Sequence, residues 1–273
     1  MTRAWRWIRR AAAPVTLAVL VWQLGTGPFL DGLGAIDGGA LAAAFGLALL
    51  TTACCAWRWR IVAHGLGVEL PLGTAVAAYY RSLFLNVTLP GGVVGDIHRG
   101  VRHGGLRAVV WERSAGQAVQ IVVTVAVLLV VPSPVHGAMP FVGVALLAAA
   151  AGVALAGHAR PSAAWAAVAL LSAFVVAGHA VTFLIAARTA GVTAPATLLV
   201  PLALLVLAAA ALPNVAGWGP REGATAWAFA AAGLGASRGV ATAVVYGALV
   251  FVASLPGAAV LAVTYLRRGA ADA

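Results

Sequence analysis

The sequence "LNVTLPGGVVGDIHRG", residues 85–100, interrupts a chain that otherwise consists mostly of alanine, valine and leucine. Two glycines follow a proline, and an aspartate, a histidine and an arginine then stand between apolar segments. Proline removes a backbone donor and glycine destabilises helix interiors, so both residues favour helix ends. The stretch therefore predicts a helix break with charged groups beside it, and its role depends on the apolar segments around it.

The composition indicates that those apolar segments lie in a membrane. Hydrophobic residues make up 63% of the 273 residues and charged residues only 9%, and the mean hydropathy is +1.00. A soluble domain has about 25% charged residues, and several apolar runs here approach the roughly 20 residues that cross a bilayer. We expect an all-α polytopic membrane protein with one integral membrane domain over residues 1–273.

The net charge of +10 is explained by membrane topology rather than by nucleic-acid binding. The arginines cluster in short connectors between apolar runs, which is the distribution that sets orientation and that contacts anionic headgroups. The two cysteines are adjacent and no histidine pair has metal-ligand spacing, so we expect no disulfide, metal or other cofactor. None of the catalytic motifs that we considered, such as a P-loop or G-x-S-x-G, is present.

Six apolar runs predict full spans, and two inserts between them do not. The expected spans are 11–25, 39–57, 108–131, 139–157, 163–187 and 240–265. The inserts 72–107 and 195–237 each contain an apolar arm, a Pro/Gly break and a second arm. Three groups of arginines indicate the cytoplasmic side. They lie near the N-terminus, after the second span (Arg58 and Arg60) and before the third span (Arg99 to Arg107). The first insert therefore begins and ends on one side, as a re-entrant hairpin does.

The order span, span, hairpin, span then repeats with opposite orientation, in halves at about 8–132 and 138–267. Inverted repeats with broken helices near the midplane are a recurring plan of transporters. This topology places both termini in the cytoplasm and the protein in the cell membrane. Arg188 and Arg238 fall outside in this scheme, against the positive-inside rule. An alternative has about eight spans, with some arms crossing fully.

The second insert contains its own break, "LPNVAGWGPREGATAWAF", residues 212–229. Pro220 suits the first position of a new helix, which places Arg221 and Glu222 in its first turn. Helix N-termini and free glycine amides attract anions, so the two breaks together supply the parts of a phosphate site. The alternative is that both motifs are surface turns with their charges in water.

The third span carries a polar stripe. Arg113, Gln117, Gln120 and Thr124 share one helical face, and Glu112 directly precedes them. Such a stripe faces either a cavity or a partner helix rather than lipid. In the fifth span, His179 is interpreted as a hydrogen-bonded structural histidine in preference to a proton relay. Tyr79 and Tyr80, in the arm before Pro90, are interpreted as interfacial anchors.

Three segments resemble the membrane domain of lysylphosphatidylglycerol synthases and its stand-alone relatives. They are "RSLFLNVTLPGGVVGDIHRG", "WERSAGQ" and "LPNVAGWGPREGA", similar to the family's P-G-G-x-G-D-x-x-R, E-R and G-x-G-x-R-E patterns. The chain departs from the family in two ways: Pro220 takes a position that another residue usually holds, and the total length is short for the family. The resemblance implies a flippase-like fold with inverted halves around a cavity. In long relatives this domain moves an aminoacylated phospholipid between leaflets and a soluble aminoacyltransferase domain makes it; without that domain here, we expect no synthase activity.

The leading hypothesis is a lipid translocase that holds a phospholipid or polyprenyl-phosphate headgroup between the hairpins. Arg99, Arg221 and the glycine amides contact the phosphate in this hypothesis, while Asp96 and Glu222 hold the arginines or bind a cationic headgroup. The candidate binding residues are Arg81, Asn86, Gly91, Gly92, Gly95, Asp96, Arg99, Glu112, Arg113, Gln117, Asn214, Arg221 and Glu222. The alternatives are an intramembrane transferase with Asp96 as base, and a non-catalytic partner of a separately encoded lipid-modifying enzyme.

Overall fold

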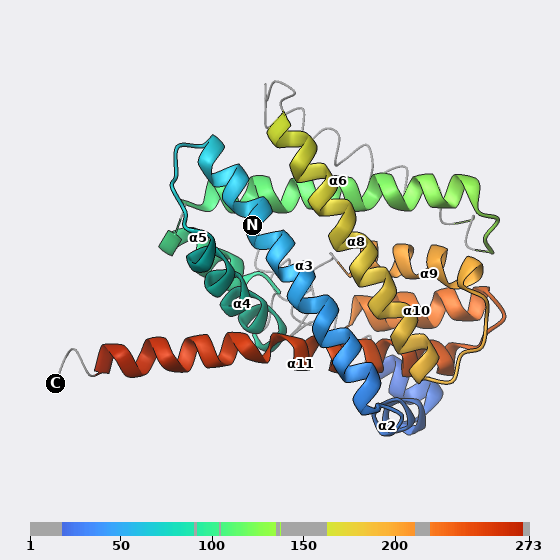
Figure 1. The fold of residues 1–273 in the computed structure, drawn as a ribbon. Helices are drawn as coiled ribbons and strands as arrows, with labels where there is room; N and C mark the ends of the chain where they lie inside the picture. Colours follow the sequence, from blue (N-terminus) through green and yellow to red (C-terminus); the bar gives the residue numbers. More distant parts are fainter. Residues whose placement is uncertain are drawn as a thin grey trace, which may run out of the picture.

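The computed structural model describes residues 18–89, 92–103, 105–134, 137, 163–210 and 219–269. Within these ranges the regular structure is helical and no strand occurs (Figure 1). The principal helices are α2 (Gly27–Gly34), α3 (Gly38–Gly65), α4 (Leu72–Thr88), α5 (Val94–His103), α6 (Gly105–Val130), α8 (Ala163–Thr189), α9 (Ala196–Ala209), α10 (Pro220–Ala231) and α11 (Ala236–Gly269). Because α3, α6, α8 and α11 are long and apolar enough to cross a membrane, the all-α polytopic fold class is confirmed.

These four helices coincide with the spans expected at 39–57, 108–131, 163–187 and 240–265. The span expected at 11–25 is described only from residue 18 onward, and the span expected at 139–157 lies outside the described residues. The total number of crossings therefore stays a prediction. What the structure adds is the arrangement of the four long helices and of the two inserts between them.

Helix α3 begins where the sequence indicates but ends two turns later. Asp37 caps its N-terminus, since the Ala40 amide donates to the Asp37 Oδ1 at 2.7 Å. The expected end near residue 57 relied on Arg58 and Arg60 as connector residues, whereas the helix continues to Gly65. Arg60 is exposed as expected, but Arg58 is buried inside the bundle. Arg58 is thus corrected from an orientation marker to an interior charge.

Both inserts fold as two helices separated by a break, as their sequences predict. α4 contacts α5, and α9 contacts α10. Asp96 lies in the first turn of α5, and Pro220 opens α10 with Glu222 in the first turn. Gly219 precedes Pro220 with φ of +114°, a conformation that side-chain-bearing residues rarely adopt. We refer to α4–α5 as the first hairpin and to α9–α10 as the second hairpin.

The contacts of α3 to α6 correspond to those of α8 to α11. α4 packs on α11 as α9 packs on α6, and α5 packs on α6 as α10 packs on α11. The central contact joins α3 to α8, which run in opposite directions, as α6 and α11 also do (Figure 1). Each hairpin is therefore bound both to its own half of the chain and to a long helix of the other half.

Small residues allow the closest helix approaches, as is common in membrane bundles. A Cβ added at Gly257 of α11 would overlap the backbone carbonyl of Tyr80 in α4, and one at Gly178 of α8 would overlap the Thr51 side chain in α3. Likewise, Gly95 brings the start of α5 against the backbone of Ser82 in α4. The first hairpin is thereby fixed closely against α11.

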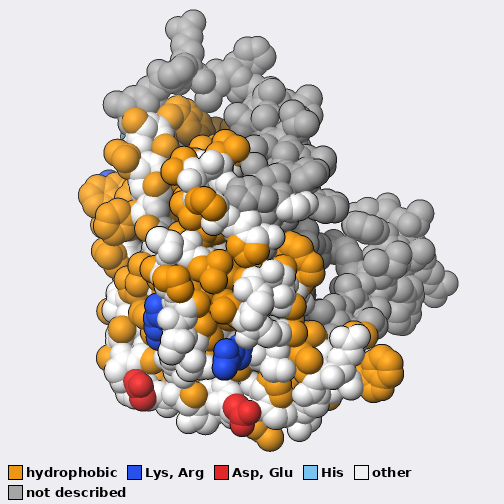
Figure 2. All heavy atoms as spheres, turned by 90° about the vertical axis from the view of Figure 1, so that its right-hand side faces the viewer, with side chains coloured by type: hydrophobic (Ala, Val, Ile, Leu, Met, Phe, Trp, Pro, Cys, Tyr) orange, Lys and Arg blue, Asp and Glu red, His pale blue; other side chains and the backbone are white. Residues whose placement is uncertain are grey.

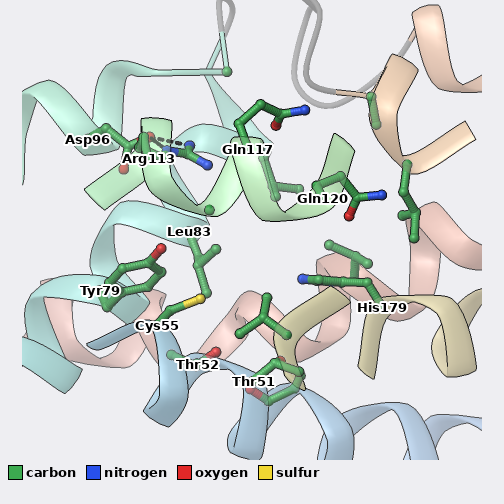
Figure 3. Close-up of a pocket in the computed structure, with 18 of the residues that line it drawn as sticks. Thr51, Thr52, Cys55, Tyr79, Leu83, Asp96, Arg113, Gln117, Gln120 and His179 are labelled. Carbon is green, nitrogen blue, oxygen red and sulfur yellow. Dashed lines mark hydrogen bonds and ion pairs between the residues drawn. The ribbon is translucent and has the colours of Figure 1, made fainter. Parts of the chain in front are cut away.

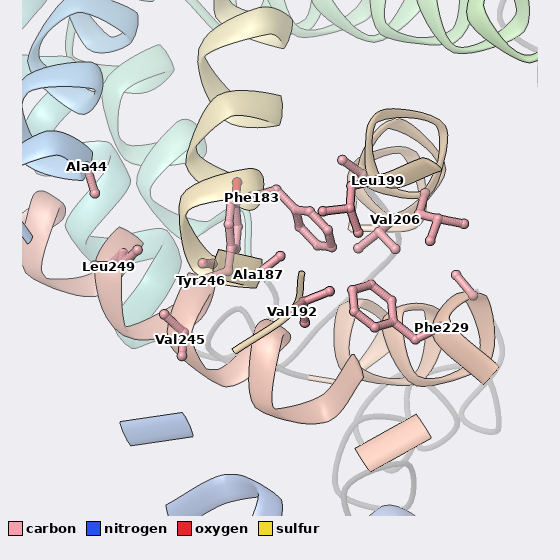
Figure 4. Packing of buried hydrophobic residues seen from close by; sticks show 14 of the residues in the cluster. Ala44, Phe183, Ala187, Val192, Leu199, Val206, Phe229, Val245, Tyr246 and Leu249 are labelled. Carbon is pink, nitrogen blue, oxygen red and sulfur yellow. The ribbon is translucent and has the colours of Figure 1, made fainter. Parts of the chain in front are cut away.

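The apolar residues divide between interior packing and an apolar outer surface. One core cluster joins α8, α9, α10 and α11 around Phe183, Phe229 and Tyr246 (Figure 4), with the two phenylalanine rings edge to face at 6.3 Å. On the face seen in Figure 2, hydrophobic side chains predominate over the described surface and charged groups are few. Apolar side chains inside and outside are typical of helices in lipid.

Candidate functional site

A cavity of about 750 Å³ lies between the long helices and both hairpins, lined by residues of α3, α4, α5, α6, α8, α9 and α11. Figure 3 shows Asp96 and Arg113 at one end and His179 toward the other. Gln117 of α6 lies across the cavity from Thr51 of α3 (Figure 3). The cavity thus carries charged and polar side chains within a lining that is otherwise largely apolar.

Asp96 anchors the charged end of the cavity. Its Oδ1 accepts hydrogen bonds from Ser82 Oγ at 3.1 Å and Arg99 Nε at 2.9 Å. Its Oδ2 accepts from Asn86 Nδ2 at 3.0 Å and from Arg113, whose Nε lies 2.9 Å away. Both oxygens of Asp96 are therefore occupied by donors from α4, α5 and α6.

Glu112, which is completely buried, joins the same cluster from α6. Its Oε1 accepts from Arg58 Nε at 2.9 Å and from the Tyr79 hydroxyl at 3.4 Å, and its Oε2 accepts from Arg99 Nη2 at 2.6 Å. Arg58 also donates from Nη1 to Ser172 Oγ at 2.9 Å. The Glu112 carboxylate thus connects α6 to α3, α4 and α5, and Arg58 extends the cluster to α8.

Arg99 lies at the centre of this cluster and does not reach the cavity. Its guanidinium carbon is 4.7 Å from the ring centre of Trp59 and 4.4 Å from that of Tyr79, both cation–π distances. The side chain is fully buried, and its Nη1 has no hydrogen-bond partner among the described residues. Arg99 therefore holds the two carboxylates together from behind the cavity wall.

The cluster carries one surplus positive charge. Three arginines, Arg58, Arg99 and Arg113, face the two carboxylates of Asp96 and Glu112. Half of the Arg113 side chain is exposed, whereas those of Arg58 and Arg99 are 5% and 0% exposed. Because Arg113 lines the cavity, the surplus charge is accessible there. A positive charge inside a protein is stabilised by an anion, so this end of the cavity suits an anionic group.

The polar stripe of α6 has both of the roles considered for it. Arg113, Gln117 and Gln120 line the cavity. Gln120 also donates from Nε2 to the Leu204 carbonyl of α9 at 3.3 Å, and Thr124 Oγ1 lies 3.5 Å from the same oxygen. The start of the stripe thus faces the cavity, while its end fixes the second hairpin to α6.

The second hairpin places its charges behind the opposite wall. His179 Nδ1 lies 3.1 Å from the Tyr246 hydroxyl, and both residues line the cavity. Arg221 lies behind Tyr246, with its guanidinium carbon 5.3 Å from the ring centre. It donates from Nε to Glu222 Oε1 at 3.0 Å, and Glu222 Oε2 accepts from the Gly219 amide at 2.6 Å. Arg221 and Glu222 are buried and do not line the cavity.

The remaining expected residues lie in different places. Gly92 lines the cavity, and the Gly95 amide donates to Asn86 Oδ1 at 2.8 Å, which orients Asn86 toward Asp96. Arg81 points elsewhere, since its Nη2 is 2.8 Å from His103 Nε2. Two of the expected residues, Gly91 and Asn214, lie outside the described part of the chain.

Arg58 is not among the site residues that the sequence predicts, and Tyr79 is predicted to lie at the membrane interface. Both are buried in the charged cluster. One signal was present: Thr51, Cys55 and Arg58 follow helical spacing, which places them on one face of α3, and all three line the cavity. No signal in the sequence alone connected Tyr246 to Arg221, because that contact depends on how α10 packs on α11.

The comparisons identify the family but no close relative. No curated protein and no solved structure matches this chain. Residues 7–164 match the family described as the lysylphosphatidylglycerol synthase TM region. The matched part contains α3 to α6, and therefore all five charges of the cluster, whereas the "GWGPRE" segment lies beyond it. Because the match covers more than half of the 273 residues, the chain belongs to the lysylphosphatidylglycerol synthase transmembrane-region family.

Proposed function

We propose that this membrane protein binds a phosphate-bearing lipid by its headgroup in the central cavity and moves that lipid between the two leaflets of the cell membrane. The observation that carries the proposal is the surplus positive charge of the cluster, which is accessible at Arg113. The arginine faces a cavity of about 750 Å³, within the size range of small-molecule sites.

Arg113 is suited to contact the phosphate directly. Its Nε and Nη2 groups are held by Asp96, and its Nη1 makes no hydrogen bond with the described residues. Asp96 therefore fixes the plane of the guanidinium and leaves one edge for a ligand. Arginine binds phosphate through charge-assisted hydrogen bonds and cannot lose its charge. Compared with the hypothesis from sequence, Arg113 takes the place of Arg99 and Arg221, which act from behind the wall.

The surroundings favour a lipid as the bearer of the phosphate. Helices that are long and apolar enough to cross a membrane enclose the cavity. Apolar side chains of α6 and α11, including Val110, Leu249 and Val250, line it beside the polar groups. A headgroup contacts the polar walls while the start of the acyl chains contacts these apolar residues. The family to which the chain belongs is itself named for a phospholipid.

The correspondence of helix contacts supports two inverted repeats with re-entrant hairpins. The sets α3 to α6 and α8 to α11 pack by one scheme, and their long helices run in opposite directions. Transporters built in this way alternate access by moving one repeat against the other around a central site. The exposed Arg60 lies near the end of α3, and the exposed Arg102 and Arg107 lie where α5 ends and α6 begins. Their positions support a cytoplasmic entry of the first hairpin and cytoplasmic termini.

A liposome assay tests the proposal. The protein is reconstituted into vesicles that contain fluorescent phosphatidylglycerol in both leaflets, and an impermeant reductant reports how much probe reaches the outer leaflet, with and without an imposed pH gradient. We expect protein-dependent exchange that falls about tenfold or more in Arg113→Ala, because a charge-assisted contact is lost. Arg107→Ala removes an exposed arginine from the same helix and serves as the matched control.

The proposal fails if the folded wild-type protein exchanges no more lipid than protein-free vesicles under both conditions. It also fails if Arg113→Ala and Arg107→Ala exchange lipid at the wild-type rate, because the cavity would then have no part in the process. Circular dichroism and gel filtration of each variant establish that the fold is retained before the rates are compared.

A further inference from the structure

We infer that the cavity selects lipids whose headgroup is anionic and hydroxylated, and that it excludes cationic, aminoacylated headgroups. This inference rests on the proposed function and names its substrate class. It separates this chain from the lipid in its family's name, because a lysyl ester adds ammonium groups to a headgroup hydroxyl and makes the headgroup cationic.

Among the described residues, no carboxylate is available to an ammonium group in the cavity. Asp96 is the acidic residue that lines it, and both of its oxygens are used by Arg99, Arg113, Ser82 and Asn86. Glu112 is fully buried and bound by two arginines. The other five of the seven acidic residues in the sequence are Asp31, Asp37, Glu69, Glu222 and Asp272.

None of these five supplies the missing carboxylate within the described structure. Asp37 caps α3, Glu69 is exposed with its Oε1 2.8 Å from His64, and Glu222 is buried with Arg221. Asp31 does not line the cavity. The segments outside the described structure contain one acidic residue, Asp272. Apart from Asp96, whose two oxygens are already bound, none of the described acidic residues lines the cavity.

Aromatic rings do not replace the missing carboxylate. Ammonium ligands are also held by cages of aromatic faces, but the described lining contains no tryptophan or phenylalanine. The two tyrosines that line the cavity each have an arginine over the ring, Arg99 over Tyr79 and Arg221 over Tyr246. A second cation beside either ring would meet like charge, so these tyrosines disfavour ammonium groups.

The same lining suits hydroxyl groups. The lining includes Thr51, Thr52, Gln117 and Tyr246, whose uncharged groups both donate and accept hydrogen bonds. His179 lies beside the Tyr246 hydroxyl. Phosphate at Arg113 neutralises the surplus charge of the cluster, and a polyol or sugar attached to that phosphate then extends along these walls. A lysyl group in the same position adds positive charge near Arg113 and Arg221. Like charges placed together in this way oppose binding.

Binding of defined lipids to the purified full-length protein tests the inference. Short-chain phosphatidylglycerol, its lysyl ester and inorganic phosphate are titrated separately, and native mass spectrometry reports occupancy. We expect phosphatidylglycerol to bind about tenfold or more tightly than its lysyl ester, since one avoided like-charge contact is worth at least that much. Inorganic phosphate is expected to bind more weakly than phosphatidylglycerol, because it lacks the hydroxylated and apolar parts.

A gain-of-function variant sharpens the test. Gln117→Glu places a carboxylate one turn beyond Arg113 on the cavity wall, and we expect it to reduce or reverse the preference for phosphatidylglycerol over the lysyl ester. Arg107→Ala changes the net charge by the same amount at an exposed position of α6, and its preference should equal that of the wild type. If Gln117→Glu does not fold, the wild-type comparison decides the inference by itself.

The outcomes separate the inference from the proposed function. Binding of the lysyl ester as tight as that of phosphatidylglycerol, and lost in Arg113→Ala, overturns the inference but leaves the proposed headgroup site intact. Binding of neither lipid, or binding unaffected by Arg113→Ala, overturns both. Inorganic phosphate that binds as tightly as the lipid identifies free phosphate as the ligand, which contradicts the lipid assignment.

Discussion

The two hairpins share one architecture but organise their charges differently. In the first hairpin, Asp96 and Arg99 of α5 exchange ion pairs with Glu112 and Arg113 of α6, and Arg58 of α3 joins them. In the second, Arg221 and Glu222 are sequence neighbours that pair with each other in the first turn of α10. The ion pairs of the first arrangement cross helices and leave a charge in excess, whereas the Arg221–Glu222 ion pair joins adjacent residues and is neutral.

This difference separates two uses of charge inside a membrane protein. A neutral, local pair stabilises a helix start at low cost, because Glu222 both neutralises Arg221 and accepts the Gly219 amide. A cluster with a surplus charge is expensive to bury unless an anion completes it. We therefore assign ligand binding to the charged cluster that the first hairpin forms with α3 and α6, and a mainly structural role to the charges of the second hairpin.

The largest expected difference comes from removing the buried carboxylate that pairs with the arginine of each hairpin, Glu112 for Arg99 and Glu222 for Arg221. Glu112→Gln leaves Arg58 and Arg99 without their shared partner, and we expect a loss of about 3–5 kcal/mol in stability, as is typical when one side of a buried ion pair is removed. Glu222→Gln affects one arginine and one amide within a single turn, so we expect about 1–3 kcal/mol. Unfolding of the purified variants in detergent measures both.

Glu69→Gln is the matched control, because Glu69 is exposed and its partner His64 is exposed too. We expect its effect to stay below about 1 kcal/mol, as is usual for surface ion pairs. If Glu222→Gln proved as damaging as Glu112→Gln, the contrast between a cross-helix cluster and a local pair would be wrong.

Substitutions at two glycines of α11 test the packing of the two hairpins, independently of their charges. A Cβ at Gly257 would overlap the backbone of Tyr80 in α4, while one at Gly247 would meet the end of the flexible Arg221 side chain at 2.5 Å. Backbone cannot move aside as a guanidinium can. We expect Gly257→Ala to destabilise by about 1–3 kcal/mol, the usual range for overpacking, and Gly247→Ala by less.

Lipid exchange by the same two variants refines this prediction. Gly257→Ala displaces α4 and with it Asp96, so exchange should fall in the liposome assay. Gly247→Ala disturbs a pair that does not line the cavity, so exchange should stay near the wild-type rate. The opposite order of effects would shift the functional assignment to the second hairpin. Gly46→Ala in α3, where a Cβ meets nothing within 4 Å, controls for the substitution itself.

The elements of the fold were predictable because they depend on local sequence. Apolar length predicted α3, α6, α8 and α11, and the Pro/Gly breaks predicted two hairpins, with Pro220 at the first position of α10 as expected. The end of α3 was not predictable by the same rule. Arg58 looks like the edge of a span until its partner is known, and Glu112 stands 54 residues away in the sequence.

The sequence predicts which residues belong to the candidate site better than it predicts how their side chains are arranged. Charged residues inside apolar sequence are costly, so Asp96, Arg99, Glu112, Arg113 and Arg221 stood out from composition alone. Which of them faces the cavity depends on side-chain direction and on helix crossings, which the sequence does not encode locally. Arg99, for example, is turned into the space between Trp59 and Tyr79. These two rings come from α3 and α4 and are brought together only by the tertiary fold.

The smallest expected difference between the hairpins is in their response to acid. His103 ends α5 beside Arg81, whereas α10 contains no histidine. Burial, followed by Arg81, Arg102 and His98, lowers the pKa of His103. Because the folded pKa lies below the ordinary value of about 6.5, the contribution of His103 is complete above that pH and is lost as the pH falls through the folded value.

Unfolding in detergent at pH 7.5 and pH 5 measures this contribution in the wild type and in His103→Gln, which keeps a neutral acceptor for Arg81 but does not titrate. We expect the wild type to lose more stability on acidification than the variant, by less than about 1 kcal/mol because the site is partly exposed. Since any other titrating group is shared by both proteins, the difference isolates His103. Equal losses would mean that the packing of α5 on α4 does not depend on a neutral His103, and the acid response would then no longer distinguish the first hairpin from the second.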